Sequence, residues 1–257
     1  MSMPALLAVR RAVSVDDFIA ELQEIVRAHP LDPELAQSVK YGKSKIEHVR
    51  RWAKDYYHYI RDDAQATAAT LARCLDRNLF LTLSQALSRR AGFFQMPNAV
   101  ELYFKFTDAL EISRGELERH YPCAETLGAL FTKRNFQLSS FPEGFTAFYL
   151  CSEGALMDVW PDETPFLAQK GFAEYVRRHY DLPSEATEYW RAYEDFRSFD
   201  GNRAWEITRE LATDASTQET IRRTLLHAVS VYQCMRRAWS DMVAGRYWEA
   251  ELVWPKR

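Results

Sequence analysis

The sequence predicts an all-α protein, a single helical bundle of about seven to nine helices. Glycine numbers only 9 among 257 residues, about half its usual ~7% share, and folds that depend on many turns need more of it. Apolar residues recur at helical spacing along almost every segment. Aromatic residues reach 14%, which favours a thick core or a cavity lined by rings. We expect one domain over residues 1–257, with a core at about 14–245 and a C-terminal tail at 246–257.

Composition excludes several classes of partner. The net charge is −3, and phosphate binding needs clustered Lys and Arg, so nucleic acid is not expected. No run of 18 apolar residues exists, so a membrane span is not expected either. The four cysteines are scattered without a C-x-x-C pair, and the N-terminus lacks the order of a signal peptide. We therefore predict a cytoplasmic protein with reduced thiols.

Helix-start signals divide the N-terminal half. Ser44 and Glu47 form a capping box of the S-x-x-E type, ahead of apolar residues at helical spacing. Ser113 and Glu116 form a second such box. The predicted helices cover about 14–29, 44–60, 63–90 and 98–111, with a loop at 91–97.

The C-terminal half is organised by one unusually apolar segment. Residues 143–160 are apolar nearly all round, so we expect a central helix that ends at Pro161. Ser216 and Glu219 form a third capping box, and Gly245 suits the position just after the last helix. The predicted helices cover about 124–138, 143–160, 164–180, 184–212 and 216–244.

Glu153 is the leading candidate for a cavity residue. It lies, with Asp158, among apolar neighbours of the predicted central helix, and buried carboxylates are rare unless they are paired. The alternative is a structural ion pair with an arginine of a facing helix. Cys151, two residues earlier, is either a nucleophile or a small core residue.

Two further helices carry polar candidates. Lys54 and His58 are four residues apart and share a helix face beside Tyr57. A lysine beside a histidine could bind an anionic substrate or tune a proton transfer; the alternative is a solvated face. Asp200 and its neighbours Arg191 and Arg203 lie on one aromatic helix, where they form either a substrate site or a surface network.

A conventional metal centre is not expected. The six histidines form no H-x-x-x-H or H-E-x-x-H pair. Glu101 and Asp108 share a helix face seven residues apart, but carboxylates alone are a weak metal signal. We predict no metal or other cofactor. Iron held by an unusual ligand set, including Glu101, Asp108, Glu153, Asp200 and His58, is the alternative.

The order of these motifs from about His29 to Met242 resembles the PqqC family of the haem-oxygenase-like superfamily, which also contains TenA thiaminases and di-iron oxidases. GKSKIEHVRRWAKDYYHY (42–59) is similar to its first capped helix. AVELYFKFTDALEISRGEL (99–117) is similar to a later helix. The resemblance places Glu153 at the family's cavity glutamate and Asp200 in its D-x-x-H motif.

The resemblance implies roles for single residues. It makes Glu153, His58 and Tyr57 catalytic, and it assigns substrate binding to a polar set. That set is Lys54, Arg191, Asp200 and Arg203.

Departures from the family pattern make two of the family's reaction types, di-iron oxidation and TenA-like hydrolysis, less expected for this chain. Trp160, Phe196 and Arg203 stand where relatives carry histidines, so most of a di-iron ligand set is missing. Asp55 and Cys151 align with a TenA aspartate and its active cysteine, but a later TenA tyrosine falls at Ala155.

The resemblance predicts a metal-free oxidoreductase of small-molecule biosynthesis, acting on a small polar or anionic metabolite, and a homodimer. The alternatives are a non-catalytic relative that binds a ligand or partner, a TenA-like hydrolase that uses Cys151, and a non-haem iron oxygenase.

Overall fold

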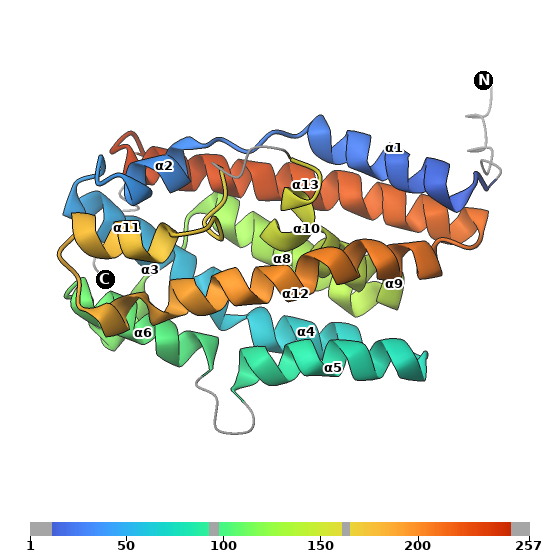
Figure 1. The fold of residues 1–257 in the computed structure, drawn as a ribbon, viewed down its shortest axis with the longest axis horizontal. Coiled ribbons are helices and arrows are strands. Elements are labelled where there is room, and N and C mark those ends of the chain that lie inside the picture. The colour runs from blue at the N-terminus through green and yellow to red at the C-terminus, as the bar shows by residue number, and fades with distance from the viewer. Residues whose placement is uncertain (1–11, 93–97, 161–164, 248–257) are drawn as a thin grey trace, which may run out of the picture.

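The computed structural model describes residues 12–92, 98–160 and 165–247, and over these ranges it is helical without strands (Figure 1). The first helices are α1 (Val15–Arg27), α2 (Glu34–Lys40), α3 (Ile46–Arg61), α4 (Asp63–Leu71), α5 (Arg77–Ala91), α6 (Ala99–Ala109) and α7 (Arg114–Arg119). The later ones are α8 (Ala124–Ser139), α9 (Phe141–Phe145), the π-helix η1 (Thr146–Leu150), α10 (Glu153–Met157), α11 (Phe172–His179), the 3₁₀-helix η2 (Ser184–Thr187), α12 (Glu188–Leu211) and α13 (Ala215–Val243). The all-α prediction is confirmed.

Helix starts agree with the sequence in one case of three. The capping box of Ser113 and Glu116 is present at α7. The box predicted ahead of α3 is absent, since Lys45 is the N-cap and makes no side-chain bond there. The third box is also wrong, because Asp214 begins α13 two residues earlier by accepting from the backbone N–H of Ser216 and its neighbour.

Breaks inside two predicted helices account for half of the elements beyond the nine predicted ranges, and α2, α7 and η2 are the others. The stretch predicted at 63–90 divides into α4 and α5, because the carboxylate of Asp76 caps a new helix. The segment predicted at 143–160 divides into α9, η1 and α10. There the N–H of Cys151 donates to Thr146 O over 3.2 Å, a five-residue spacing that belongs to a π-helix. Ser152 then caps α10.

The longest helix, α13, forms the centre of the packing. It contacts α1, α2, α3, α8, α9 and η1, and in Figure 1 it runs with α12 along most of the long axis of the bundle. Fully buried aromatic side chains fill the interior, with Trp52 stacked on Trp190 at a centroid distance of 5.7 Å. Gly245 has φ +72° directly after α13, as the sequence predicts. Within the described ranges, no helix combines the length and apolarity that a membrane crossing requires.

Candidate functional site

Glu153 lies at the first residue of α10 and is 2% exposed. Its Oε1 accepts from Nη1 of Arg236 on α13 at 2.6 Å, and its Oε2 accepts from the N–H of Ala168 at 2.9 Å. Arg236 is itself 0% exposed and donates through Nη2 to Pro165 O. The structural ion pair offered as the alternative for Glu153 is therefore present, while Asp158 is exposed.

Buried phenols surround this ion pair. Burial, with a smaller electrostatic contribution from Glu153, raises the pKa of Tyr56, Tyr59, Tyr193 and Tyr232. These four hydroxyls therefore stay protonated at neutral pH, the state in which a phenol can donate a hydrogen bond. The tyrosines come from α3, α12 and α13, so only the packing of those helices brings them together.

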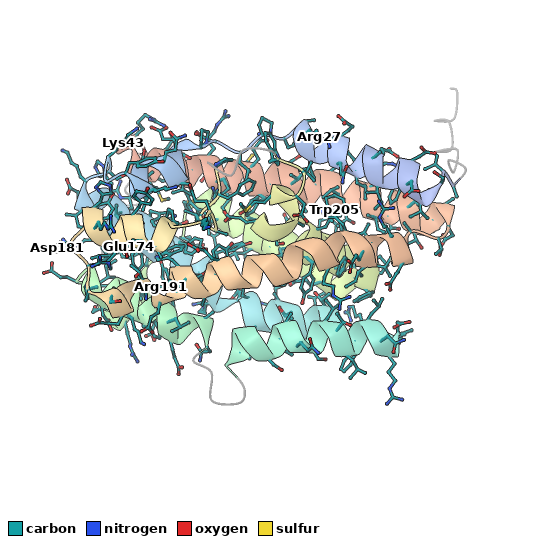
Figure 2. The ribbon with its side chains drawn as sticks, in the orientation of Figure 1. Arg27, Lys43, Glu174, Asp181, Arg191 and Trp205 are labelled. Carbon is teal, nitrogen blue, oxygen red and sulfur yellow. The ribbon has the colours of Figure 1, made fainter. Side chains whose placement is uncertain are left out.

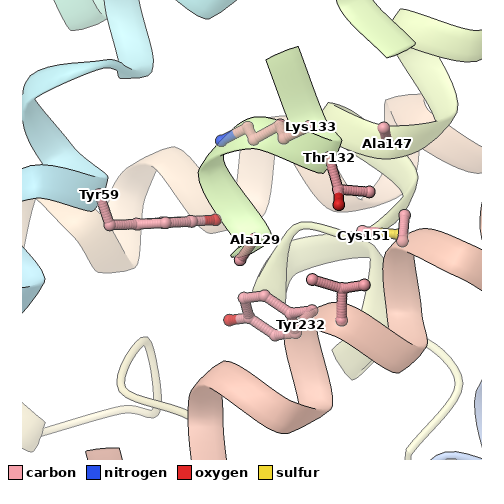
Figure 3. Close-up of a pocket in the computed structure, with 9 residues that line it drawn as sticks. Tyr59, Ala129, Thr132, Lys133, Ala147, Cys151 and Tyr232 are labelled. Carbon is pink, nitrogen blue, oxygen red and sulfur yellow. The ribbon is translucent and has the colours of Figure 1, made fainter. Parts of the chain in front are cut away.

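An inner pocket lies beside this centre, with a cavity volume of about 20 Å³ (Figure 3). In that view the Tyr59 and Tyr232 hydroxyls lie on one side and Cys151 on the other. Three alanine positions leave the space unfilled. The inner pocket is lined by Tyr59, Ala129, Thr132, Lys133, Ala147, Cys151, Ala228, Val231 and Tyr232.

Cys151 directly follows the π-helix η1. It reaches the pocket wall together with Ala147, which lies four residues earlier on the same face. Cys151 is 5% exposed, and burial raises the pKa of its thiol to about 12, against a weaker opposing effect of Lys133. The thiol is therefore almost fully protonated at neutral pH, which disfavours it as an unassisted nucleophile.

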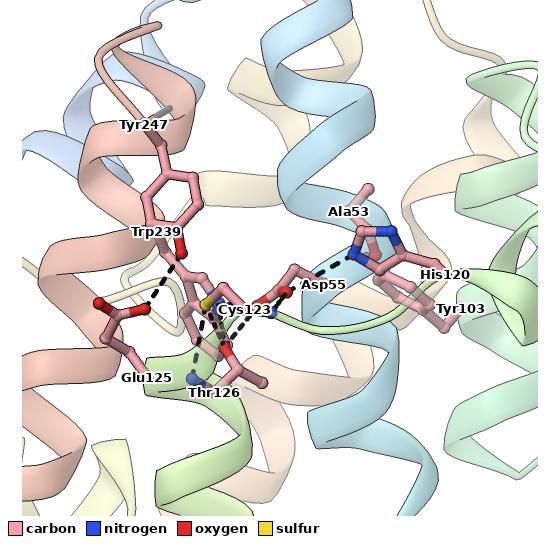
Figure 4. Close-up of polar contacts among 9 residues, drawn as sticks. All are labelled: Ala53, Asp55, Tyr103, His120, Cys123, Glu125, Thr126, Trp239 and Tyr247. Atoms are coloured by element: carbon pink, nitrogen blue, oxygen red, sulfur yellow. Dashed lines mark hydrogen bonds and ion pairs between the residues drawn. The ribbon is translucent and has the colours of Figure 1, made fainter. Parts of the chain in front are cut away.

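A second polar centre surrounds Asp55 of α3, which is 0% exposed (Figure 4). Its carboxylate accepts from the N–H of Cys123 and from Trp239 Nε1, each at 2.7 Å, and from the Thr126 hydroxyl. His120 Nε2 lies 3.5 Å from Asp55 Oδ1. Burial favours the protonated form of Asp55, but these donors together lower its pKa. Asp55 is therefore a carboxylate, and its hydrogen bonds join α3 to α8 and α13.

His58 lies next to the Asp55 centre rather than in the inner pocket. Its ring is 5% exposed and its centroid is 5.8 Å from that of His120. Burial, helped by Arg61 and His120, lowers the pKa of His58. Tyr57 is also buried, with its ring 5.8 Å from Phe104. Both side chains are enclosed, so a solvated face is wrong for this part of α3.

The predicted substrate-binding residues lie apart from the inner pocket. Arg191 is exposed and donates to the Ser184 hydroxyl at 3.2 Å (Figure 2). Arg203 is exposed too, with Glu206 as its partner at 3.4 Å. Lys54 is half-buried near Glu116. The side chain of Asp200 lies outside the described residues. The substrate-binding roles of these residues stay predictions.

The structure does not bring together those residues of the unusual iron site whose side chains it describes. Glu101 and Asp108 are exposed on α6, whereas Glu153 is buried against Arg236. Among the side chains that the structure describes, no three His, Cys, Asp or Glu lie close enough together to hold a metal. The described side chains of this set therefore do not meet, and that of Asp200 lies outside the described residues, so iron stays an alternative.

Sequence reasoning missed two charged residues that decide the site. Arg236 occurs within the buried stripe of α13, four residues after Tyr232 and three before Trp239. A cation in such a stripe is a signal for a buried partner. Lys133 lies at a half-buried position of α8 between the inner pocket and Asp63. No local pattern marks it, because its surroundings come from four different elements.

Sequence comparisons place part of the chain among known proteins. A model of the TENA/THI-4/PQQC family matches residues 20–129. A 4-aminobenzoate synthase of Chlamydia muridarum is 30% identical over 108 residues, which cover 41% of this chain and 44% of that protein. A 4-aminobenzoate synthase of Chlamydia trachomatis serovar D is 27% identical over 143 residues, covering 53% and 57%. The matches thus span about half the length of these curated relatives.

Solved structures share the fold over most of the chain. A CADD-like protein of unknown function from Nostoc punctiforme has a TM-score of 0.64 at 8% identity, covering 89% of this chain and 98% of that one. A TenA homologue from P. horikoshii has a TM-score of 0.59 at 15% identity, covering 91% and 100%. A domain from Shewanella denitrificans, described as having a heme oxygenase-like fold, has a TM-score of 0.60 at 10% identity, covering 87% and 89%. The chain therefore has the haem-oxygenase-like fold, and its residues 20–129 are similar to the TENA/THI-4/PQQC family.

Proposed function

We propose that this protein is an enzyme of small-molecule biosynthesis that binds a small carboxylate-bearing metabolite in the inner pocket. One observation carries the proposal. Two phenols, a thiol and an ammonium group converge on the inner pocket, beside the buried pair of Glu153 and Arg236. A few convergent polar groups on an apolar wall are typical of metabolite sites. The cavity measures about 20 Å³, so side chains of the wall must move when a metabolite binds.

Each polar group has a distinct part in this proposal. Lys133 supplies the positive charge that a substrate carboxylate needs. Tyr232 presents a protonated hydroxyl, because burial and Glu153 raise its pKa. Arg236 and the N–H of Ala168 hold the Glu153 carboxylate in one orientation. Glu153 therefore positions the Tyr232 hydroxyl and can accept a proton that passes through it.

The curated relatives direct the choice of reaction. Both are named 4-aminobenzoate synthases, and 4-aminobenzoate is a small aromatic carboxylate of the class that suits Lys133. We therefore take formation of 4-aminobenzoate as the first reaction to assay. The metal-free, PqqC-like oxidoreduction predicted from the sequence stays the reaction class that we propose within such a pathway.

A growth assay tests the proposal. The chain is expressed in a bacterium that cannot make 4-aminobenzoate and is grown without it. We expect the wild type to restore growth, and Tyr232→Phe, which removes one hydroxyl from the pocket, to reduce 4-aminobenzoate formation at least about tenfold. Tyr121→Phe is the matched control, since Tyr121 is 76% exposed. Folded wild-type protein that gives neither growth nor 4-aminobenzoate by mass spectrometry would exclude this reaction.

A TenA-like hydrolase is the second candidate, because Cys151 lines the inner pocket. The raised pKa of the thiol opposes it. Cys151→Ala separates the two proposals. Loss of all turnover would support a cysteine nucleophile, whereas unchanged turnover would remove the hydrolase. A ligand retained in native mass spectrometry without any turnover would instead indicate a binding protein.

A further inference from the structure

A second pocket lies between α4 and α8, with a cavity volume of about 80 Å³. We call it the outer pocket, because exposed side chains such as Gln65, Arg134 and Leu138 reach its wall. The space exists because α4 presents Ala66 and Ala69 there. None of the described residues that line the inner pocket is exposed, and its cavity volume is only about 20 Å³, so the outer pocket is the larger of the two.

Lys133 lines both pockets. Its side chain is 13% exposed, and its Nζ lies 3.3 Å from Asp63 Oδ1. The same Nζ lies 4.1 Å from the ring centroid of Phe148 and 4.5 Å from that of Tyr59. Tyr59 belongs to the inner pocket. A positive charge therefore stands between aromatic rings at the junction of the two pockets.

The outer pocket also offers donors from one face of α8. Gln137 is 3% exposed, and its Nε2 is buried without a hydrogen-bond partner. Arg134 lies one turn away on the same wall. On the opposite wall Asp62 is opposed by Arg61 at 3.6 Å. Asp63 already faces Lys133. Lys133, Arg134 and Arg61 carry three positive charges, and Asp62 and Asp63 carry two negative charges, so the sum is +1. The amide of Gln137 is an unused donor beside them.

We propose that a carboxylate-bearing substrate reaches the inner pocket through the outer pocket, and that Lys133 selects for its negative charge at the junction. An anion at the junction meets a cation with little competing water, where charge interactions are stronger than at the surface. This inference rests on the proposed function only in taking the inner pocket as the substrate site.

Labelling of Cys151 tests the inference without any substrate. Iodoacetate and iodoacetamide are similar in size and differ in charge, and both react with thiols. Cys151 reports on the inner pocket, while the exposed Cys234 is an internal reference in the same chain. Peptide mass spectrometry gives the rate at each cysteine. The readout is the iodoacetate-to-iodoacetamide ratio at Cys151 divided by that at Cys234, which cancels any change in thiol pKa.

Lys133 variants test the selection. In the wild type we expect this normalised ratio to be about three or more, since a local positive charge raises the rate at which anions arrive. Lys133→Arg should keep this preference and Lys133→Met should abolish it. Circular dichroism checks that each variant is folded. A ratio near one in the wild type, or an unchanged ratio in folded Lys133→Met, would overturn the role of Lys133.

The route has its own pair of variants. Ala69→Phe fills the outer pocket and should slow labelling of Cys151 by both reagents at least about fivefold, because a side chain now blocks the passage. Ala68→Phe is the matched control, since Ala68 is exposed and outside the pocket wall. Equal labelling rates in Ala69→Phe and the wild type, or no labelling of Cys151 at all, would overturn the route.

The two proposals fail in distinguishable ways. If the labelling rates agree with the proposed route but the protein shows no turnover, the proposed function is contradicted and the route is still supported. If the protein shows turnover but the labelling rates do not depend on Lys133 or Ala69, the route is contradicted and the proposed function is still supported.

Discussion

Arg236 and Glu153 are charged side chains that the fold removes from water almost completely, at 0% and 2% exposure. Ions in such places lose several kcal/mol of hydration, which the partner and further hydrogen bonds must offset. Here Ala168 and Pro165 supply those further bonds. The pair therefore joins α10, α13 and the segment before α11 at one point, and it also orients the carboxylate of the proposed site.

We expect Arg236→Met to lower the free energy of unfolding by about 3–5 kcal/mol, because it leaves the Glu153 carboxylate buried without its partner. Glu153→Met should be similarly damaging. The double variant should be more stable than either single variant, since no buried charge remains in it. Urea denaturation measures all three. A double variant that loses as much as the two single variants together would contradict this account of the pair.

His58 supplies a pH dependence of stability. Its pKa in the folded protein is lowered by burial and by Arg61 and His120, so the unfolded chain binds a proton more readily than the folded one. The neutral ring is therefore favourable to folding above the unfolded pKa of about 6.5, and this contribution is lost as the pH falls through the folded value.

We expect the free energy of unfolding of the wild type to fall more steeply than that of His58→Gln between about pH 7 and pH 5. Denaturant midpoints measured across this range give both slopes. His227→Gln, at an exposed position, is the control. Equal slopes for the wild type and His58→Gln would show that His58 is not the group that titrates.

At the scale of the elements, short breaks matter as much as long helices. The π-helix η1 and the Ser152 cap lie between α9 and α10 and turn both Cys151 and Glu153 inward. A continuous α-helix over 143–160, as the apolar pattern predicts, would lack this local change of phase. The break therefore brings a thiol and a carboxylate, two residues apart, to one region of the interior.

Close packing of α9 against its neighbours gives an element-scale prediction. A Cβ at Gly144 would lie 3.0 Å from the Gln137 Cα and 3.2 Å from the Thr70 hydroxyl oxygen. We expect Gly144→Ala to destabilise the protein by roughly 1–3 kcal/mol, because backbone cannot move aside cheaply.

Gly128→Ala is the matched control within α8, where a new Cβ would meet nothing within 4 Å. This change should stabilise the protein by roughly 0.5–1 kcal/mol through helix propensity. Thermal unfolding followed by circular dichroism measures both variants. The same sign for both would contradict the packing of α9 against α4 and α8.

At the scale of the whole molecule, the bundle leaves several large apolar side chains in water. Tyr121 is 76% exposed and Phe131 is 64% exposed. Aromatic residues are enriched in protein interfaces, so this surface is compatible with the predicted homodimer.

We expect sedimentation equilibrium at micromolar concentration to give twice the mass of one chain. A single species with the mass of one chain would contradict the homodimer.

Limited proteolysis gives an independent test of the prediction that residues 1–257 form one domain. A stable fragment much shorter than 14–245 would contradict that prediction.

The fold class and the burial of particular residues follow from local patterns in the chain. Low glycine content and helical spacing were sufficient for an all-α bundle, because both act through local backbone preferences and the need to bury one helix face. The same reasoning left Glu153 as either a cavity residue or one half of a buried ion pair, and the structure contains the pair. It also placed the cap of α7 and the glycine that follows α13, since those signals lie within a few residues of each other.

Which polar groups meet in the interior depends instead on how the helices pack. Arg236 lies 83 residues from Glu153, and Lys133 reaches Asp63, Tyr59 and Phe148 from a separate helix. Helical periodicity says which face of a helix is buried, but it does not say which other face lies opposite. The partner of Glu153, the two pockets and the position of Lys133 between them depend on how α3, α4, α8 and α13 pack, which no local pattern contains.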